Sequence, residues 1–463
     1  MKIKINTTII LLAIIAVTAV FTWIVPAGQY EKVSQNGRQV LVEGSFHFIE
    51  SSPQTPFDVL KAPMEAFGRS STAGVIAFLL IIGGAFMVVE KTGAIASAIK
   101  ATSALFLKHP ALKSLYIPIT TILFAIGGAT FGMGEETLIF IPILIPLSLS
   151  LKYDSAIGVM MPFLGSIAGF TAGFMNPFST GIAQGIAQLP LYSGFTFRLI
   201  IWIVATAVAI VFIWLYSKKV AKNPEYSLTY DFDKERRKEL HINQNSQEKF
   251  TLSHKIVLTA FALTMVTLVF GVLKYEWYIT EIGALFFSLG IVAAIFGGIK
   301  MSEATEAFYN GVRGMAEIVF MLALATAIIV IAENGHILDT ILFYMAGIIS
   351  KLNSVVASWA AFLMETVLKF FIPSSSGKAV LTMPILAPLS DLIGLSRQTM
   401  ILAFQFGDGW ADAIIPTNAV LLAAIGMAKI PYQKWVKFVI PLLAIWFIMS
   451  FAFLAIAVKI NLQ

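Results

Sequence analysis

Long apolar runs constrain this sequence more than any other feature. Stretches of about twenty mostly apolar residues recur along the chain, for example at 7–28, 198–216, 256–273 and 438–458. A helical run of this length spans the hydrocarbon core of a bilayer. Apolar residues make up 58% of the 463-residue chain and charged residues only 13%, which is unusual for a soluble domain. The sequence therefore predicts an all-α polytopic membrane protein.

The amino terminus and the cysteine and histidine content exclude several classes of protein. Residues 1–28 have a basic start, but their apolar part is too long for a signal peptide, so we expect an uncleaved first helix. The chain has no cysteine, which excludes disulfides and thiolate chemistry. Its five histidines show no spacing typical of a metal site, so no cofactor and no enzyme activity are expected. The net charge of +6 lies in the loops, where it reports topology rather than nucleic-acid binding.

The two halves of the chain repeat each other. PILIPLS at 142–148 matches PILAPLS at 384–390 at an offset of 242 residues, and at the same offset Asn176 falls on Asn418. Further matches lie on both sides of these in the same order. Collinear matches of this kind indicate a tandem duplication.

A polar linker separates the copies. We predict a first repeat at 1–217, a linker at 218–254 and a second repeat at 255–463. Five predicted crossings lie between equivalent points of the two copies, and an odd number gives inverted repeats. Lysine and arginine gather on one side, including Lys2, Lys4 and the linker, which predicts a cytoplasmic N-terminus.

Four segments are too long for single straight spans and carry polar interruptions. The segments 112–150 and 353–392 have the polar tips GMGEET and PSSSGK and are predicted to be re-entrant hairpins. The segments 155–190 and 396–431 contain proline, glycine and asparagine in mid-course and are predicted to be broken helices. Inverted repeats with paired hairpins and broken helices are typical of secondary transporters that work by alternating access, with the site at the repeat interface.

The candidate binding residues come from the polar parts of these four segments. They are Glu135, Glu136, Asn176, Ser374, Ser375, Ser376, Gly377, Lys378, Asp408, Asp412 and Asn418. Asp408 and Asp412 are four residues apart, so they share a helical face and are expected to have a cation beside them. Glu135 and Glu136 either face the cavity and meet a cation, or only cap the following helix.

The second tip and the two asparagines are candidates to bind the other end of the substrate. The hydroxyls and backbone N–H groups of Ser374–Gly377 either hold a substrate carboxylate or serve only as a turn and cap. Asn176 and Asn418 are candidates to bind sodium or substrate. In the core segments, four acidic residues stand against Lys378 alone, which favours a basic amino acid over a dianion. Glu365 and Lys369 are predicted to form a structural i,i+4 pair.

These segments also carry a family resemblance. GMGEET, GFMNPFSTGIAQG, PSSSGKAVLTMPILAPLSDL and FQFGDGWADAIIPTN resemble the YfcC-type family, which is similar to ArcD-like basic amino acid antiporters and to anaerobic four-carbon dicarboxylate carriers of the ion transporter superfamily. The resemblance covers residues 5 to 460, approximately. It implies a bacterial inner-membrane carrier, commonly a homodimer, whose hairpins and broken helices move like an elevator against a scaffold that includes 7–28 and 256–298.

The resemblance leaves two substrate classes open. It implies exchange of arginine for ornithine or a related pair, and the alternative is dicarboxylate uptake coupled to sodium or protons. A membrane enzyme is disfavoured by the lack of a hydrolase or metalloprotease motif. The unlike charges of the two hairpin tips argue against a channel.

Overall fold

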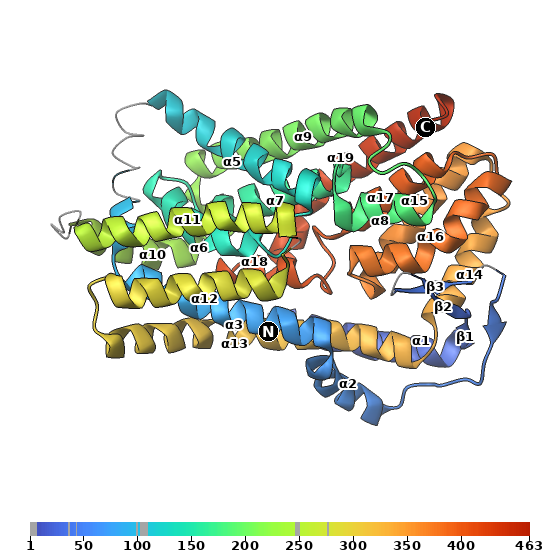
Figure 1. Ribbon diagram of the computed structural model, residues 1–463, viewed down its shortest axis with the longest axis horizontal. Coiled ribbons are helices and arrows are strands. Elements are labelled where there is room, and N and C mark those ends of the chain that lie inside the picture. Colours follow the sequence, from blue (N-terminus) through green and yellow to red (C-terminus); the bar gives the residue numbers. More distant parts are fainter. Residues whose placement is uncertain are drawn as a thin grey trace.

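Helices that follow the long axis of the molecule make up most of the structure (Figure 1). The computed structural model describes residues 7–35, 38–42, 44–98, 101, 110–245, 251–275 and 277–463. Lys2, Lys4 and part of the linker lie outside these ranges. Within them, eight helices are long and apolar enough to cross a membrane. The chain is therefore a multi-pass membrane protein.

From the predicted hairpins onward, the helices follow one another in the same order in the two halves. The first half contains α1 (Thr7–Ile24), β1 (Gly28–Gln29), β2 (Lys32–Gln35), β3 (Arg38–Leu41), β4 (His47–Phe48), α2 (Pro56–Gly68), α3 (Ser70–Lys91), α5 (Pro110–Phe131), α6 (Thr137–Ser150), α7 (Ser155–Ala172), η1 (Pro177–Gly181), α8 (Ile182–Ile186) and α9 (Phe195–Lys222). The linker contains η2 (Pro224–Tyr226) and α10 (Tyr230–Asn245). The second half contains α11 (Leu252–Tyr275), α12 (Ile279–Phe296), α13 (Met301–Asn334), α14 (Leu338–Ile349), α15 (Ser354–Phe371), α16 (Ser375–Leu392), α17 (Arg397–Ala411), α18 (Ala419–Met427) and α19 (Tyr432–Lys459).

The predicted hairpins and broken helices correspond to pairs of helices. α5 and α6 fill the segment 112–150, and α15 and α16 fill 353–392. In 155–190 and 396–431 a helix ends in mid-segment and a second one begins after a short irregular stretch. Figure 1 places α6 toward one end of the long axis and α16 toward the other.

Polar residues set the starts of these apolar helices. The Asp154 side chain accepts from the backbone N–H of Ile157 at 3.0 Å at the start of α7. Asn353 caps α15 in the same way. Such caps satisfy backbone donors that have no partner inside the helix.

A short β structure, which the sequence analysis did not predict, lies in the segment after α1. β1 pairs with β4 and β2 with β3, both antiparallel. The backbone N–H of Gly28 donates to His336 O at 3.1 Å, and that of Tyr30 donates to the carboxylate of Asp339 at 3.1 Å. These bonds hold the segment against the residues around the start of α14.

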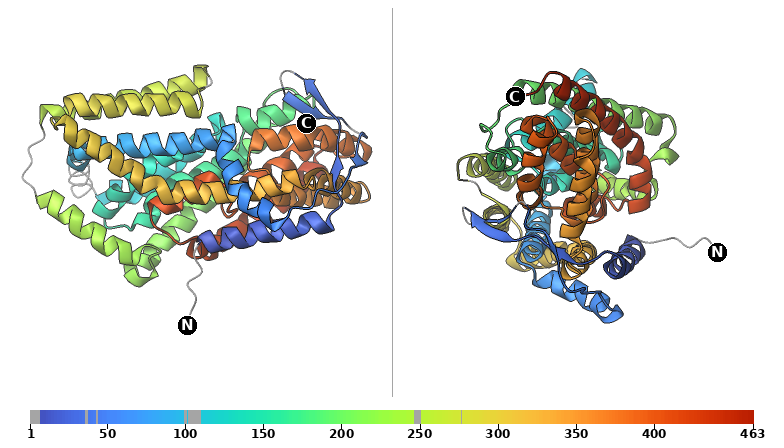
Figure 2. Two further views of the ribbon diagram at one scale, coloured as in Figure 1. Left: turned by 90° about the horizontal axis from the view of Figure 1, so that it is seen from below. Right: turned by 90° about the vertical axis from the view of Figure 1, so that its right-hand side faces the viewer.

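Two helical groups pack beside each other (Figures 1 and 2). α3, α11, α12 and the first part of α13 share one hydrophobic core, which includes Phe78, Phe286 and Leu289. Ile139 of α6 also belongs to this core, and the rest of α13 packs in the other one. The hairpins and broken helices share a larger core. Within this second group α6 packs on α18 and α16 packs on α8, so each hairpin contacts the broken helix of the other copy.

Glycines at equivalent positions allow close packing within each copy. Gly165 on α7 and Gly407 on α17 are 242 residues apart. A Cβ atom on Gly165 would lie 2.7 Å from Thr121 O on α5, and one on Gly407 would lie 2.6 Å from Phe362 O on α15. Both neighbours are backbone atoms, which cannot rotate away. α7 and α17 therefore approach the hairpins as closely as they do because these positions lack side chains.

Alanine at either glycine should lower the melting temperature of the detergent-purified protein. Overpacking of this kind costs about 1–3 kcal/mol. Gly314→Ala in α13 is the matched control, because nothing lies within 4 Å of a Cβ atom placed there. Alanine there should leave the melting temperature unchanged or raise it, since it is the better helix former. Equal melting temperatures for Gly165→Ala, Gly407→Ala and Gly314→Ala would contradict this account.

Candidate functional site

The four polar segments predicted from the sequence line one cavity of about 680 Å³. The first hairpin tip contributes residues 132–137, and the second contributes Pro373–Ser376. The broken helices contribute Phe178 and Ile182 from the first copy, and Gly409, Asp412, Thr417 and Asn418 from the second. Two hairpin tips that are far apart in the sequence thus face a common space.

The candidate residues divide into those that line the cavity and those that do not. Glu135, Glu136, Ser374, Ser375, Ser376, Asp412 and Asn418 line it. Asn176, Gly377, Lys378 and Asp408 do not. Lys369, which the sequence analysis treated as structural, also lines the cavity.

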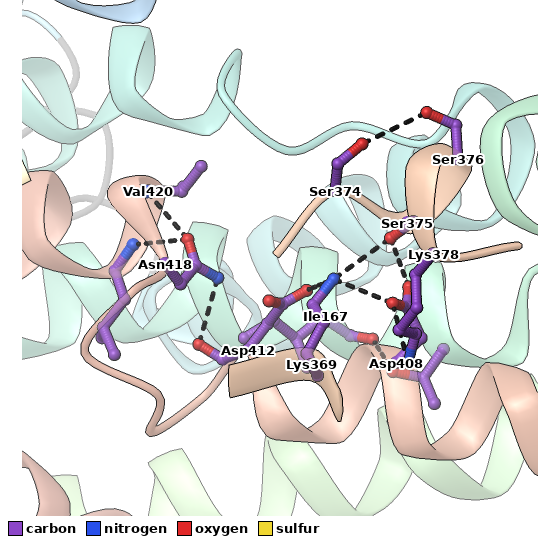
Figure 3. Close-up of polar contacts among 12 residues, drawn as sticks. Ile167, Lys369, Ser374, Ser375, Ser376, Lys378, Asp408, Asp412, Asn418 and Val420 are labelled. Carbon is purple, nitrogen blue, oxygen red and sulfur yellow. Dashed lines mark hydrogen bonds and ion pairs between the residues drawn. The ribbon is translucent and has the colours of Figure 1, made fainter. Parts of the chain in front are cut away.

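Lys369 connects three helices at the buried side of the cavity (Figure 3). Its Nζ lies 2.9 Å from Asp408 Oδ1 and 3.3 Å from Asp412 Oδ2. It also donates to Ser375 Oγ at 3.2 Å. The Ser375 hydroxyl in turn donates to Asp408. One ammonium group thus supplies the cation that the sequence analysis expected beside the two aspartates, and it joins α15, α16 and α17.

Lys378 and Glu365 form a second ion pair, sealed from the cavity. Lys378 Nζ lies 2.9 Å from Glu365 Oε2 and 3.3 Å from Asp408 Oδ1, and the side chains of Lys378, Glu365 and Asp408 are fully buried. The ammonium group also donates to Glu365 O at 3.0 Å and lies 5.0 Å from the centre of the Phe404 ring. The sequence position of Lys378 suggested that its charge belongs to the serine tip. In the structure the ammonium group points instead to Glu365 and Asp408.

The predicted pairing of Glu365 with Lys369 is wrong. Both side chains lie on one face of α15, as their spacing requires, but each is paired with a different partner. Glu365 pairs with Lys378 on α16, and Lys369 pairs with the aspartates of α17. Contacts between helices thus take precedence over the local i,i+4 interaction, which is worth only a few tenths of a kcal/mol.

Asn176 and Asn418 have the same role in the two copies. Asn176 Oδ1 accepts from the N–H groups of Phe178 and Ser179 at 2.9 and 3.2 Å. Asn418 Oδ1 accepts from Val420 and Leu421 at 2.8 and 3.2 Å. Each amide caps the second part of a broken helix, with both lone pairs of its oxygen engaged. Sodium binding near them stays a prediction and needs other oxygen ligands.

The acidic tip contacts the neighbouring helical group. Glu136 is buried, and its Oε2 accepts from Gly134 N at 2.9 Å. Tyr278, which immediately precedes α12, donates its hydroxyl to Glu135 Oε1 at 3.4 Å. The Tyr278 ring also lies 6.1 Å from that of Phe178, between ring centres. Glu135 thus faces the cavity and a residue outside the hairpins.

The serine tip forms the start of α16. The hydroxyl of Ser374 accepts from Gly377 N at 3.2 Å and lies 3.3 Å from that of Ser376. The tip therefore has the capping role that the sequence analysis kept open. Because Ser374, Ser375 and Ser376 also line the cavity, this helix start borders the space available to a ligand.

The wall opposite the tips consists of residues that sequence reasoning missed. Arg69 and Glu333 form an ion pair of 2.7 Å, and the hydroxyls of Thr72 and Thr326 are 3.3 Å apart. All four line the cavity. Glu333 lies at the end of α13, next to its last residue. Arg69 immediately precedes α3, and no motif marks it.

A family comparison fits this architecture. Residues 6–459 match the family described as DcuC, C4-dicarboxylate anaerobic carrier. The chain belongs to this family. The resemblance found in the sequence is thereby confirmed, and the chain is a secondary transporter rather than an enzyme.

Two curated proteins are similar along nearly their whole length. A protein of Escherichia coli (strain K12) named "Putative basic amino acid antiporter YfcC" is 35% identical over 484 residues, covering 96% of this chain and 94% of that protein. A protein of Haemophilus influenzae (strain ATCC 51907 / DSM 11121 / KW20 / Rd) named "Uncharacterized protein" is 27% identical over 495 residues, covering 97% and 96%.

Two solved structures show weaker similarity. The Alcanivorax borkumensis YdaH transporter is 13% identical with a TM-score of 0.43, covering 99% of both chains. Neisseria gonorrhoeae MtrF is 16% identical with a TM-score of 0.42, covering 99% of this chain and 96% of the other. Both TM-scores are below 0.5, so the overall similarity is weak.

Removing one member of the sealed pair should destabilise the carrier strongly. Lys378→Met leaves Glu365 buried without its cation, and breaking such a pair costs about 3–5 kcal/mol. The double variant Lys378→Met with Glu365→Gln should regain much of the lost stability, because the buried carboxylate left unpaired by Lys378→Met is then neutral. Melting temperatures in detergent measure both effects.

The surface pair of Arg397 and Asp391 provides the control. These groups lie 2.6 Å apart but are 29% and 52% exposed, so Asp391→Asn should cost about 1 kcal/mol or less. A Lys378→Met variant as stable as Asp391→Asn would contradict the role given to the sealed pair.

Proposed function

We propose that the chain transports amino acids with a cationic side chain by alternating access, exchanging one for another as in arginine/ornithine antiport. The cationic group binds near Asp412 and the Glu135–Glu136 tip, and the carboxylate binds at the Ser374–Ser376 tip. The main support is that these chemically opposite tips line the same cavity. A helix start favours an anion, and acidic groups favour a cation.

The net charge of the cavity wall also supports this substrate class. Its acidic residues are Glu135, Glu136, Glu333 and Asp412, and its basic residues are Arg69 and Lys369. The acidic excess is smaller than the four-to-one count of the sequence analysis, because Arg69, Glu333 and Lys369 line the cavity whereas Asp408 and Lys378 do not. It still favours a substrate with net positive charge.

The mechanism we propose is an elevator motion of inverted repeats. From the hairpins onward the helices follow the same order in both halves, and each hairpin packs on the other copy's broken helix, which is the pattern expected of a two-fold arrangement. One wall of the cavity comes from α3, α12 and α13, parts of which share a second core with α11. That group is suited to be the scaffold past which the hairpins and broken helices move.

The cellular setting is part of the same proposal. The carrier lies in the bacterial inner membrane with a cytoplasmic N-terminus and functions as a homodimer. Either the exchanged amino acid or a coupling ion, sodium or a proton, drives the cycle. The relatives in two bacteria and the distribution of lysine and arginine support the location and the orientation.

A four-carbon dicarboxylate is the second candidate substrate. It is favoured by the family match and by two cationic side chains, Arg69 and Lys369, in the cavity wall. In that case the serine tip and these cations bind the two carboxylates, and the acidic groups serve a coupling cation.

Counterflow in reconstituted vesicles separates the two candidates. Vesicles loaded with unlabelled arginine should accumulate labelled arginine or ornithine, and Asp412→Asn should lower the initial rate about tenfold or more, as expected for the loss of a charged contact worth about 1.5–3 kcal/mol. Asp391→Asn, whose carboxylate pairs with Arg397 away from the cavity, is the matched control and should leave the rate unchanged. Accumulation of labelled succinate with neither amino acid accepted would overturn the substrate assignment.

A further inference from the structure

Lys369 occupies the place where the cationic group of a substrate is expected. Its ammonium group contacts both Asp408 and Asp412 and lines the cavity. We propose that Lys369 is a tethered competitor of the transported cation, which neutralises Asp412 in the empty carrier and leaves it when substrate binds. This inference rests on the proposed function and adds the specificity-determining residue that a substrate must displace.

The contacts of the two aspartates identify which one the substrate reaches. Asp408 is fully buried and is held by Lys369, Lys378 and Ser375. Asp412 is 17% exposed, lines the cavity, and has Lys369 as its one ion-pair partner among the described residues, at the longer distance of 3.3 Å. The bond between Lys369 and Asp412 is therefore the one that a cation entering the cavity can replace.

Charge balance explains why a cation must remain beside Asp412 throughout. Three carboxylates, on Glu365, Asp408 and Asp412, face two ammonium groups. Asp412 also lies at the C-terminal end of α17, where the helix dipole disfavours negative charge. Without Lys369 this carboxylate would stand beside the cavity with no cation, at a high cost in a membrane interior.

The released ammonium group has a second partner within reach. Lys369 Nζ is already 3.2 Å from Ser375 Oγ at the serine tip. A substrate carboxylate bound at that tip would lie beside it. The cationic group of such a substrate would pair with Asp412, and its carboxylate would pair with Lys369. Two ion pairs thus replace the single pair of Lys369 with Asp412. A dicarboxylate supplies no group to replace Lys369 at Asp412, so the arrangement favours amino acids.

Chemical rescue tests this proposal on the purified full-length protein. Lys369→Ala should have a lower melting temperature than wild type in sodium chloride. Methylammonium chloride at equal ionic strength should raise it by about 2 °C or more, since a ligand that binds only the folded state stabilises it. Wild type should show no such rise, because the tethered ammonium group has an effective concentration in at least the millimolar range.

Two further variants exclude a general salt effect. Lys378→Ala removes an equally buried ammonium group that does not line the cavity, so methylammonium should not restore it. Lys369→Ala with Asp412→Asn removes the carboxylate that needs a cation, so rescue should disappear. If Lys369→Ala is too unstable to melt, the yield of folded protein after purification with and without methylammonium replaces the melting temperature.

Each outcome decides the proposal. Rescue restricted to Lys369→Ala supports it. Absence of rescue, or equal rescue of Lys378→Ala or of the double variant, overturns it and leaves Lys369 as a fixed structural group. Stabilisation of the wild type by arginine is measured separately. If rescue occurs and arginine has no effect, the proposed substrate fails while the exchangeable ion pair stands.

Discussion

The structure depends on balancing charge inside a membrane. A carboxylate in a membrane interior needs a partner, because neither water nor a polar surface is there to solvate it. Two lysines supply that partner here. Lys378 is sealed between Glu365 and Asp408, and Lys369 lies at the border of the cavity beside Asp412. The first pair is buried away from the cavity, and the second leaves the Asp412 carboxylate partly exposed to it, where we propose that an exchangeable cation binds.

Helix ends and glycines bring these groups together. Lys369 lies in the last turn of α15, Ser375 in the first turn of α16, and Asp412 immediately after α17. The ends of three helices therefore meet at one point in the interior of the protein. Gly407 allows α17 to approach α15 closely enough for this to occur. Breaks in the helices thus place backbone ends and charged groups at the cavity, where they interact with one another and border the space open to a ligand.

Local pattern was enough to predict the helical segments but not the pairing of the charges. Span lengths, proline and asparagine positions and the internal repeat located the helix pairs in 112–150 and 353–392, the interruptions in 155–190 and 396–431, and the four polar segments that line one cavity. The partners of Lys369 and Lys378 depend on how α15, α16 and α17 approach each other, which helical spacing does not encode. Arg69 and Tyr278 were missed for the same reason, since each meets the site only through contacts with distant segments.

In the proposed function, two unlike hairpin tips bind the two unlike ends of one substrate. Displacement of labelled arginine from purified protein tests it most directly. Agmatine lacks the carboxylate and citrulline lacks the side-chain charge, so each loses the partner for one tip. We predict that unlabelled arginine displaces the label at a concentration at least about tenfold lower than either analogue, as expected for one lost charged contact. Equal displacement by agmatine, or displacement by succinate at the same concentration as arginine, would contradict the account.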